Sequence, residues 1–415
     1  MKTKLLILIA VATMLSCLNA NRFLKAPNLT AQTKTSEVEI VYLNSPNDSD
    51  ENDINDAYEY INNAINELLK GIDFSSVDKE FEGVSFLGGQ TVRDNILNLV
   101  SGDYKIDYKD LFTLLLNEFW GELGNLSGYF AMIIAIAILW SISGAVSSGN
   151  RDFGVTQLFH FISLGCVIGV VAIVFGNVYL FTFDCVNNLE RQSDAVLPVL
   201  LTIMTASGAS VSASIYQPQV AFLTKAITSV VKRVLLPIVM LLFIFNCVGY
   251  LSDRFQLEKT KAFLKSAFKW ITGITVLLFN FFVTAQGLTA SVYDGISIKA
   301  LKYALGNSVP LVGNLVSGGF DVVFASLILI KNAVGSFALI ALVFTVISPI
   351  IKIAVFPLFL RFTAGVIEPI ADKKLTGFLS GVADTSAYIS TISMVGASSY
   401  FITLLLIICS LGGGV

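Results

Sequence analysis

The 415-residue chain is 54% hydrophobic and only 14% charged, with a mean hydropathy of +0.74. Because soluble domains are roughly half apolar and about 25% charged, this composition excludes an ordinary water-soluble protein. The net charge of −3 conceals two regions: residues 21–119 carry 18 acidic against 8 basic residues, and residues 120–415 carry 12 against 17. This asymmetry indicates an acidic polar module joined to a membrane domain, and it argues against a nucleic-acid partner.

Residues 1–20 have the layout of a secretory signal peptide. A basic start is followed by an apolar core from Leu5 to Leu15 and by the small residue Ala20. We therefore predict export with cleavage near Ala20, and an uncleaved anchoring helix is the alternative. Cys17 also raises the question of lipid attachment, but the residues before it fit the usual attachment pattern poorly.

A polar segment and an acidic helical module follow the signal peptide. Residues 21–53 contain too little apolar material to offset the entropy of folding, which predicts a flexible tether. In residues 54–119, apolar positions recur every three or four residues, as is typical of amphipathic helices. We predict that residues 54–119 form a small exported module. In an alternative interpretation, the last helix of this segment lies on the membrane surface. The predicted helices are Ile54–Leu69, which ends near Gly71, Val92–Val100 and Tyr108–Phe119.

Residues 120–415 form the predicted polytopic membrane domain. A helix needs about 20 predominantly apolar residues to cross the hydrocarbon core of a bilayer. Several windows of the chain meet this length without interruption. They are Gly128–Val146, Leu158–Phe183, Val234–Leu251, Trp270–Val292, Val322–Ile351 and Ile389–Ile408.

Two further apolar windows contain residues that disfavour a simple crossing. Val196–Tyr216 is diluted by the run MTASGASVSAS, and Ile351–Ile370 contains two prolines and three charged residues. Irregular backbone is tolerated at membrane depth only where protein or water shields it. We therefore predict an all-α fold: a transmembrane helical bundle of about 6–8 membrane segments, one or two of them re-entrant or broken. The side on which the C-terminus lies depends on whether Ile351–Ile370 crosses.

The distribution of lysine and arginine predicts the orientation of the chain. With the module outside, the first two spans return the chain to an acidic exported loop, Asp184–Asp194. Residues 253–269 carry five basic residues against two acidic ones and should be cytoplasmic. This orientation requires that Val196–Tyr216 does not cross alone, which favours a re-entrant hairpin. Interleaved aromatic residues predict that the basic stretch is a surface helix or docks a cytoplasmic partner. Its basic residues are Arg254, Lys259, Lys261, Lys265 and Lys269.

Four charged residues fall at membrane depth and are candidate lining residues of a conduit. They are Lys331, Lys352, Arg361 and Glu368. A charge at the bilayer centre costs about 3 kcal/mol or more, so each should face protein or water. In the structural alternative, Lys352 and Arg361 reach the membrane surface, and Lys331 pairs with an acid such as Asp321 or Glu368.

The sequence contains no motif that predicts catalysis. The sequence lacks a phosphate-binding glycine-rich loop, paired histidines with a glutamate, and a nucleophile elbow. We therefore predict a non-enzymatic protein without cofactor or metal.

Four longer strings of the sequence resemble those of the stage III sporulation protein AE family. They are LPVLLTIMTASGASVSASIYQPQ from Leu197, QGLTASVYDGISIKALKYALGNSVPLVGNLVSGGFD from Gln286, LIKNAVG from Leu329 and RFTAGVIEPIADKK from Arg361. The resemblance extends from about Leu111 to the C-terminus, in order and with similar spacing. No catalytic motif defines the family, so no functional residue is carried over.

The resemblance implies a subunit of the mother-cell complex of endospore-forming bacteria, located in the outer forespore membrane. Its implied partners are the AA ATPase, the AB to AH membrane proteins and, across the intermembrane space, forespore protein Q. The expected function is a non-enzymatic subunit of a secretion-like channel between mother cell and forespore. A small-solute permease, suggested by broken helices and buried charges, and a scaffold that recruits other subunits are the alternatives.

Overall fold

The computed structural model describes residues 63, 65–81, 91–101, 108–147, 153–207, 210–251, 257–308 and 313–409. The predicted signal peptide (1–20), the predicted tether (21–53) and Arg254 lie outside these residues, so their predictions stay untested. Every element that the structure assigns in this part of the chain is helical.

The described chain begins with a small helical unit. Residues 65–70 are helical and end at a turn at Gly71, as predicted. The helix α3 (Ser75–Phe81), which the sequence pattern did not indicate, and the predicted helix α4 (Val92–Ser101) follow.

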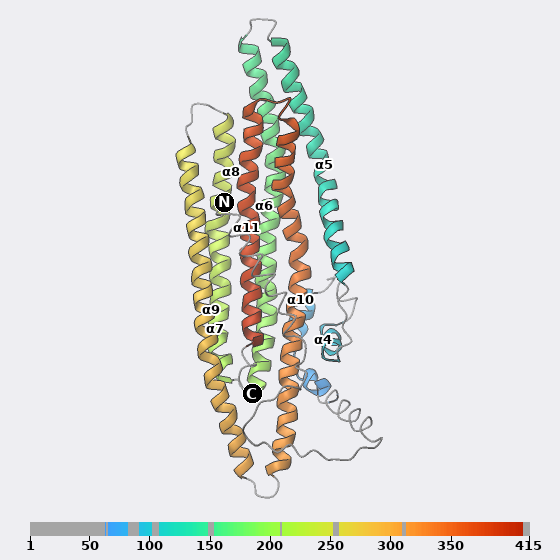
Figure 1. The fold of residues 1–415 in the computed structure, drawn as a ribbon, viewed down its shortest axis with the longest axis vertical. Helices are drawn as coiled ribbons and strands as arrows, with labels where there is room; N and C mark the ends of the chain where they lie inside the picture. Colours follow the sequence, from blue (N-terminus) through green and yellow to red (C-terminus); the bar gives the residue numbers. More distant parts are fainter. Residues whose placement is uncertain are drawn as a thin grey trace, which may run out of the picture.

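Six long helical passes form the bundle (Figure 1). The third pass is one continuous helix in which a π-helical turn, η3, joins α7 to α8. Within the described residues, six helices are long and apolar enough to cross a membrane, so the predicted all-α membrane bundle is confirmed. The passes are α5 (Tyr108–Ser147), α6 (Phe153–Ala206), α7 (Ser210–Val230) with η3 (Val231–Leu235) and α8 (Leu236–Leu251), α9 (Glu258–Ser308), α10 (Gly313–Ile367) and α11 (Lys373–Cys409).

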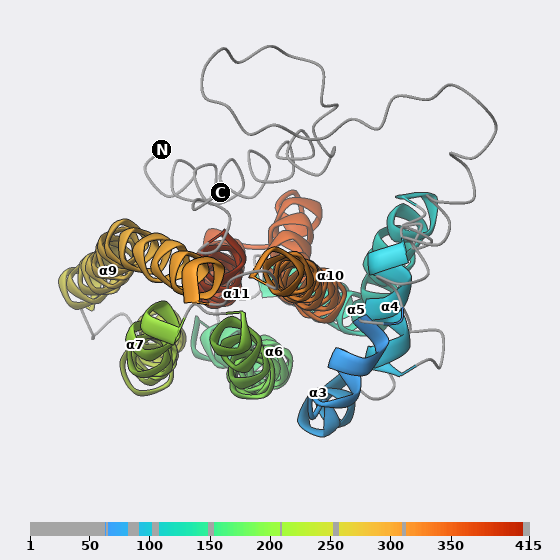
Figure 2. The ribbon, with the colours of Figure 1, turned by 90° about the horizontal axis from the view of Figure 1, so that it is seen from below.

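Successive passes run antiparallel, and the bundle therefore has two distinct ends. In Figure 1, α5, α8 and α10 finish at the upper end, where α6, α9 and α11 begin. At the lower end α6 and α9 finish and α7 and α10 begin, and α11 also finishes toward this end (Figure 1). Seen end-on, α9 lies at one side of the bundle and α5 at the other, with α10 and α11 between them (Figure 2). The end of α11 therefore lies at the same end of the bundle as the acidic module.

The predicted exported loop Asp184–Asp194 is not a loop, because α6 continues through it to Ala206. The chain reverses at Ser207 and resumes as α7 at Ser210, inside the window Val196–Tyr216. That window therefore holds the tip of a long helical hairpin and makes no crossing of its own. The polar residues that suggested a loop instead contact neighbouring helices, as described below.

The second apolar window that contains residues unfavourable to a crossing, Ile351–Ile370, is also a continuous helix as far as Ile367. It belongs to the same pass as Val322–Ile351. Proline at position 357 cannot donate a backbone hydrogen bond to the carbonyl of Ile353. The Ser390 hydroxyl of α11 donates to that carbonyl instead, at 3.3 Å. This contact between two helices supplies a hydrogen-bond donor to the carbonyl that the proline leaves without its helical partner.

The first membrane helix begins earlier than predicted. The predicted helix Tyr108–Phe119, assigned to the exported module with a membrane-surface helix as the alternative, is the start of α5, so the predicted boundary at 119/120 falls inside a continuous helix. The described part of the module consequently ends before Tyr108.

The longest helices exceed the thickness of a bilayer. The helices α6, α9 and α10 contain 54, 51 and 55 residues. At about 1.5 Å per residue each is roughly 80 Å long, whereas the hydrocarbon core is about 30 Å thick. A tilt of normal size cannot absorb this difference. A large part of the bundle therefore projects beyond the hydrocarbon core.

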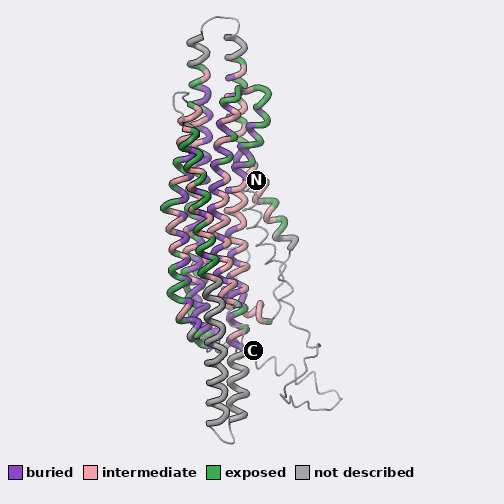
Figure 3. Tube along the Cα trace, turned by 60° about the vertical axis from the view of Figure 1, so that its left-hand side comes forward, coloured by how far each residue is buried: buried purple, intermediate pink, exposed green. Residues whose placement is uncertain are grey.

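Buried residues run along the described length of the bundle (Figure 3), and those described form two apolar clusters, one above the other. Along α6 the upper cluster ends at Val186 and the lower cluster begins at Leu189; along α10 the change falls between Val346 and Ile353. The module packs only on the lower cluster, where Phe81 meets Phe337 edge to face with ring centroids 5.9 Å apart. The module thus covers the flank of the lower half of the bundle.

Candidate functional site

A layer of polar side chains crosses the bundle where the two apolar clusters meet. Four consecutive residues of α6, positions 190–193, form its centre. Successive helical residues point about 100° apart around the axis, so these four side chains reach four different neighbouring elements. Glu190 accepts from Lys232 of η3 at 2.6 Å, Arg191 donates to Glu80 of α3 at 3.3 Å, Gln192 accepts from Thr345 of α10 at 3.3 Å, and Ser193 donates to Thr224 of α7 at 3.5 Å.

A third ion pair joins α10 to α5 about two helical turns above Thr345. Lys352 lies 3.7 Å from Glu118 and 5.6 Å from the ring centre of Phe181. Both charged side chains are about one-third exposed, at 36% and 32%. The layer therefore joins α3, α6, α7, η3 and α10, and the pair above it adds α5; these contacts can fix the relative heights of the helices because each polar group needs its partner at a matching level.

The π-helical turn η3 carries the basic partner of Glu190. Its widened backbone is seen in the hydrogen bond from the Leu236 N–H to the Val231 carbonyl, five residues earlier. Single π-helical turns occur frequently at functional sites. Lys232 projects from this turn to Glu190 and lies 5.7 Å from the ring centre of Phe183.

A small cavity of about 20 Å³ lies beside the Glu190–Lys232 pair, between α6, α7, α9 and α11. The Tyr400 hydroxyl is buried there and has no hydrogen-bond partner among the described residues. A volume of this size holds about one water molecule. The cavity can therefore hold a bound water molecule. It is too small to be the solute site that a permease would need. Its polar lining residues are Glu190, Thr224, Thr228, Ser399, Tyr400 and Thr403.

The outward face of the bundle changes character at the polar layer. Well above it, α6 exposes apolar side chains such as Ile173 and Leu180; at and below it, α6 exposes Arg191 and Asp194. The adjacent third pass changes in the same sense, from the exposed Met240 and Leu241 of α8 to polar residues on α7. The exposed polar residues of α7 include Ser214, Gln217 and Lys225.

Lys331 is buried in the lower half of the bundle, where it caps α11. Its Nζ donates to the carbonyl oxygens of Ile408 at 2.7 Å and of Ile407 at 3.4 Å. A cation is favourable at this position because a helix C-terminus carries a partial negative charge. The expected pairing with Glu368 is wrong, since 37 residues of helix separate the two by roughly 55 Å; Asp321 lies outside the described side chains.

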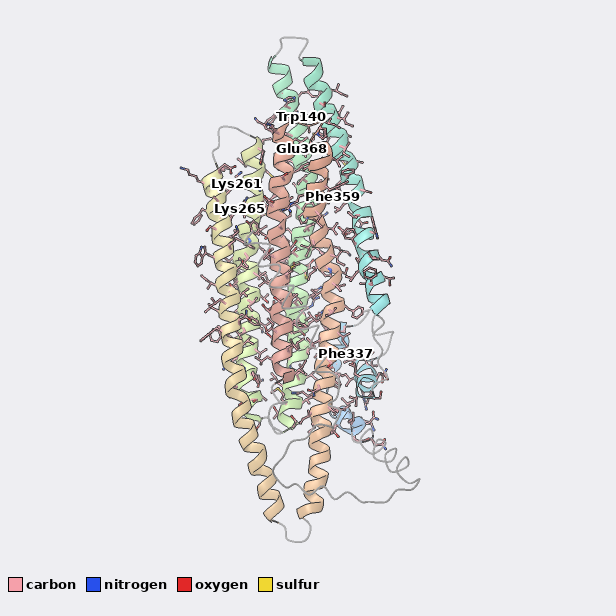
Figure 4. The ribbon with its side chains drawn as sticks, viewed as in Figure 1. Trp140, Lys261, Lys265, Phe337, Phe359 and Glu368 are labelled. Atoms are coloured by element: carbon pink, nitrogen blue, oxygen red, sulfur yellow. The ribbon has the colours of Figure 1, made fainter. Side chains whose placement is uncertain are left out.

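The four candidate conduit residues do not meet at one site. Arg361 donates to Asp384 of α11 at 2.9 Å, and both side chains are exposed. Glu368 follows the last residue of α10 and is exposed at the upper end of the bundle (Figure 4). Lys331, Lys352 and Arg361 are thus spread along α10, and Glu368 lies in the turn after it. If these residues lined a conduit, each would do so at a different height of the bundle and without the other three.

The predicted docking residues lie at the upper end of α9 (Figure 4). Lys259 and Lys269 are exposed, and Lys265 is half-buried. Lys261 is buried, forms an ion pair with Glu258 and lies 5.6 Å from the ring centre of Tyr250. Only three of the four described lysines are therefore available to a partner.

Sequence reasoning missed the polar layer. Glu190 and Arg191 were assigned to a loop, and Lys232 was not singled out at all. The available signal was the run of four polar residues at positions 190–193 between two apolar stretches. It indicated that one long helix could continue through a polar layer. The pairing partners lie 31 to 153 residues away along the chain, so only the fold identifies them.

Comparison with known proteins gives a family. The family model described as "Stage III sporulation protein AE" matches residues 91–412. Over 323 residues the chain is 21% identical to "Stage III sporulation protein AE" of Bacillus subtilis (strain 168), and the match covers 77% of this chain and 80% of the relative. No solved structure matches the chain. Because the family match contains α4 and all six long passes, the chain belongs to the stage III sporulation protein AE family.

Proposed function

We propose that this chain is a non-enzymatic membrane subunit of a secretion-like channel complex between mother cell and forespore, required for endospore development. Membership of the stage III sporulation protein AE family supports a role in sporulation. The observation that carries the proposal is the length of the bundle: helices of about 80 Å extend far beyond a hydrocarbon core of about 30 Å. A subunit that has to meet partners beyond its own bilayer needs such an extension.

In this proposal the lower end of the bundle faces the intermembrane space. The acidic module packs there on α6 and α10, and the net positive upper end of α9 faces the mother-cell cytoplasm, as the positive-inside rule favours. The cytoplasmic lysines would meet the AA ATPase, and the lower end would meet the remaining complex and, indirectly, forespore protein Q. Conduit lining and platform formation both fit this arrangement.

Deletion of the gene tests the proposed role. Vegetative growth should be unchanged, while development should stop after engulfment and the count of heat-resistant spores should fall by orders of magnitude. Restoring the intact gene at another locus should recover spore formation. A normal count of heat-resistant spores in the deletion strain would refute the proposal.

Thiol labelling tests the proposed sidedness. In a chain without native cysteines, made in vegetative cells so that the corresponding side faces the medium, Ser75→Cys on α3 and Gln217→Cys on α7 should react with a membrane-impermeant maleimide in intact cells, because both positions are exposed near the lower end. Ser266→Cys, exposed near the start of α9, should react only after the cells are permeabilised. Labelling of Ser266→Cys in intact cells, with protection of the other two, would invert the orientation.

A further inference from the structure

Tyr400 of α11 brings an unused hydrogen-bond donor to the cavity beside the Glu190–Lys232 pair. The residue lines this cavity and is only 4% exposed. Its hydroxyl has no hydrogen-bond partner among the described residues. Burying a hydroxyl without a partner is unfavourable, because the group gives up its hydrogen bonds to water. The Tyr400 hydroxyl therefore needs a group inside the cavity that accepts its proton.

Three other polar side chains on the cavity wall can accept a hydrogen bond but cannot donate one into the cavity. The Ser399 hydroxyl donates to the Val395 carbonyl at 2.7 Å, and the Thr403 hydroxyl donates to the Ser399 carbonyl at 2.9 Å. The single proton of each hydroxyl is thus in use, while its oxygen can still accept. Glu190 accepts from Lys232 through Oε2, and an ionised carboxylate has room for further donors. None of the three accepts directly from the Tyr400 hydroxyl.

A water molecule has the hydrogen-bonding pattern that complements this wall. It can accept from the Tyr400 hydroxyl and donate two hydrogen bonds, one of them to Glu190. Buried waters typically make about three hydrogen bonds to polar groups that would otherwise lack partners. The cavity volume of about 20 Å³ is sufficient for one such molecule. The size of the cavity and the arrangement of donors and acceptors therefore indicate the same ligand.

A monovalent cation of similar size fits the cavity less well than water. A metal cation cannot accept the proton of the Tyr400 hydroxyl. The charge of Glu190 is already balanced by Lys232, whose Nζ lies 2.6 Å from the carboxylate. These two side chains are only 26% and 20% exposed, and a net positive charge beside them would lose much of its hydration. The cavity therefore favours a neutral ligand.

We propose that a bound water molecule bridges the Tyr400 hydroxyl of α11 to the Glu190 carboxylate of α6. Glu190 then holds Lys232 of η3 and the water at the same time. A water that bridges two protein groups stabilises their arrangement nearly as well as a direct hydrogen bond. The bridge brings α11 into the polar layer and fixes the height of α11 relative to α6 and η3.

Tyr400→Phe in the purified full chain tests this inference, because the sign of its effect depends on the water. If the water holds the hydroxyl, the variant should lower the melting temperature by about 1–3 °C. If the hydroxyl has no partner, phenylalanine should leave the melting temperature unchanged or raise it, since a buried unsatisfied group is removed. That result would overturn the proposal.

Exchange of the salt separates water from a cation. Replacing choline chloride by sodium or potassium chloride at equal ionic strength should leave the melting temperature of the unchanged chain the same. A rise in sodium or potassium that Tyr400→Phe abolishes would assign the cavity to a cation and overturn the water bridge.

A double-mutant cycle tests the connection to Glu190. The background Glu190→Met/Lys232→Met removes the ion pair without leaving either charge alone. In this background the melting-temperature loss caused by Tyr400→Phe should fall to less than half, because the bridge has lost its acceptor. Tyr388→Phe, roughly 18 Å away along α11, is the matched control and should have the same effect in both backgrounds. Equal losses for Tyr400→Phe in both backgrounds would contradict the bridge.

An experimental structure of the unchanged chain, at a resolution that shows ordered waters, gives a readout that needs no variant. Density for one water within about 3.2 Å of both the Tyr400 hydroxyl and the Glu190 carboxylate is the expected result. A well-ordered cavity without such density would refute the bridge. These measurements use purified protein, so their failure would not bear on the proposed role in sporulation.

Discussion

Lys331→Glu is expected to abolish the accumulation of folded protein in the membrane. The Lys331 side chain is fully buried, and its Nζ donates to the last carbonyl oxygens of α11. Glutamate would place a carboxylate against these oxygens at the negative end of the helix dipole. An uncompensated buried charge costs about 3–5 kcal/mol, which is a large part of the roughly 5–15 kcal/mol that stabilises a typical folded domain.

The measurement is the amount and the thermal stability of monodisperse protein after extraction in a mild detergent. Asn332→Glu is the matched control, because it introduces the same charge at the next position, where the side chain is exposed. We expect Asn332→Glu to behave like the unchanged protein. If Lys331→Glu accumulated normally with an unchanged melting temperature, Lys331 would not be the cap that holds the end of α11.

Glu190→Lys is expected to destabilise the bundle by about 2–4 kcal/mol, since it removes a paired charge and places a second cation beside Lys232. Glu190 and Lys232 are 26% and 20% exposed and lie 2.6 Å apart, so solvent screens their interaction only in part. Restoring an opposite charge should therefore recover much of the loss. We expect the double variant Glu190→Lys/Lys232→Glu to regain more than half of the lost stability.

Thermal unfolding of the single and double variants in detergent provides the required double-mutant cycle. Asp194→Lys, an exposed change of the same kind one helical turn further along α6, is the control and should shift stability by less than about 0.5 kcal/mol. The Glu190–Lys232 pair would not stabilise the bundle if the double variant lost as much stability as the two single variants together. A rescue would show that the pair acts across α6 and η3.

Much of the architecture could be predicted from local sequence. Each of the six uninterrupted apolar windows lies within one of the long passes, and the helix Val92–Val100 is found almost unchanged as α4. These features depend on composition and periodicity over one segment, because a bilayer selects apolar helices one at a time. The length of the passes could not be predicted in this way, since polar residues continue α6 and prolines remain inside α10.

The candidate site was predicted less well than the fold. The charges of α10 were identified as residues that need partners, and Lys331, Lys352 and Arg361 each have one. The identity of the partners was not predictable: Lys331 contacts carbonyl oxygens 76 and 77 residues further along the chain. A sequence pattern shows that a buried charge must be compensated but does not show which group compensates it.

The sequence by itself determined that this protein is an all-helical membrane protein with an acidic N-terminal region and determined its family. The tertiary structure alone decided that Glu190 to Ser193 belong to a helix and not to a loop, because their partners on α3, α7, η3 and α10 satisfy polar groups that would otherwise favour contact with water. It also decided that α10 continues through Pro357, where Ser390 of α11 donates to the carbonyl that the proline leaves without its helical partner. Local composition sets the cost of each residue in a helix, and only contacts between distant segments offset that cost.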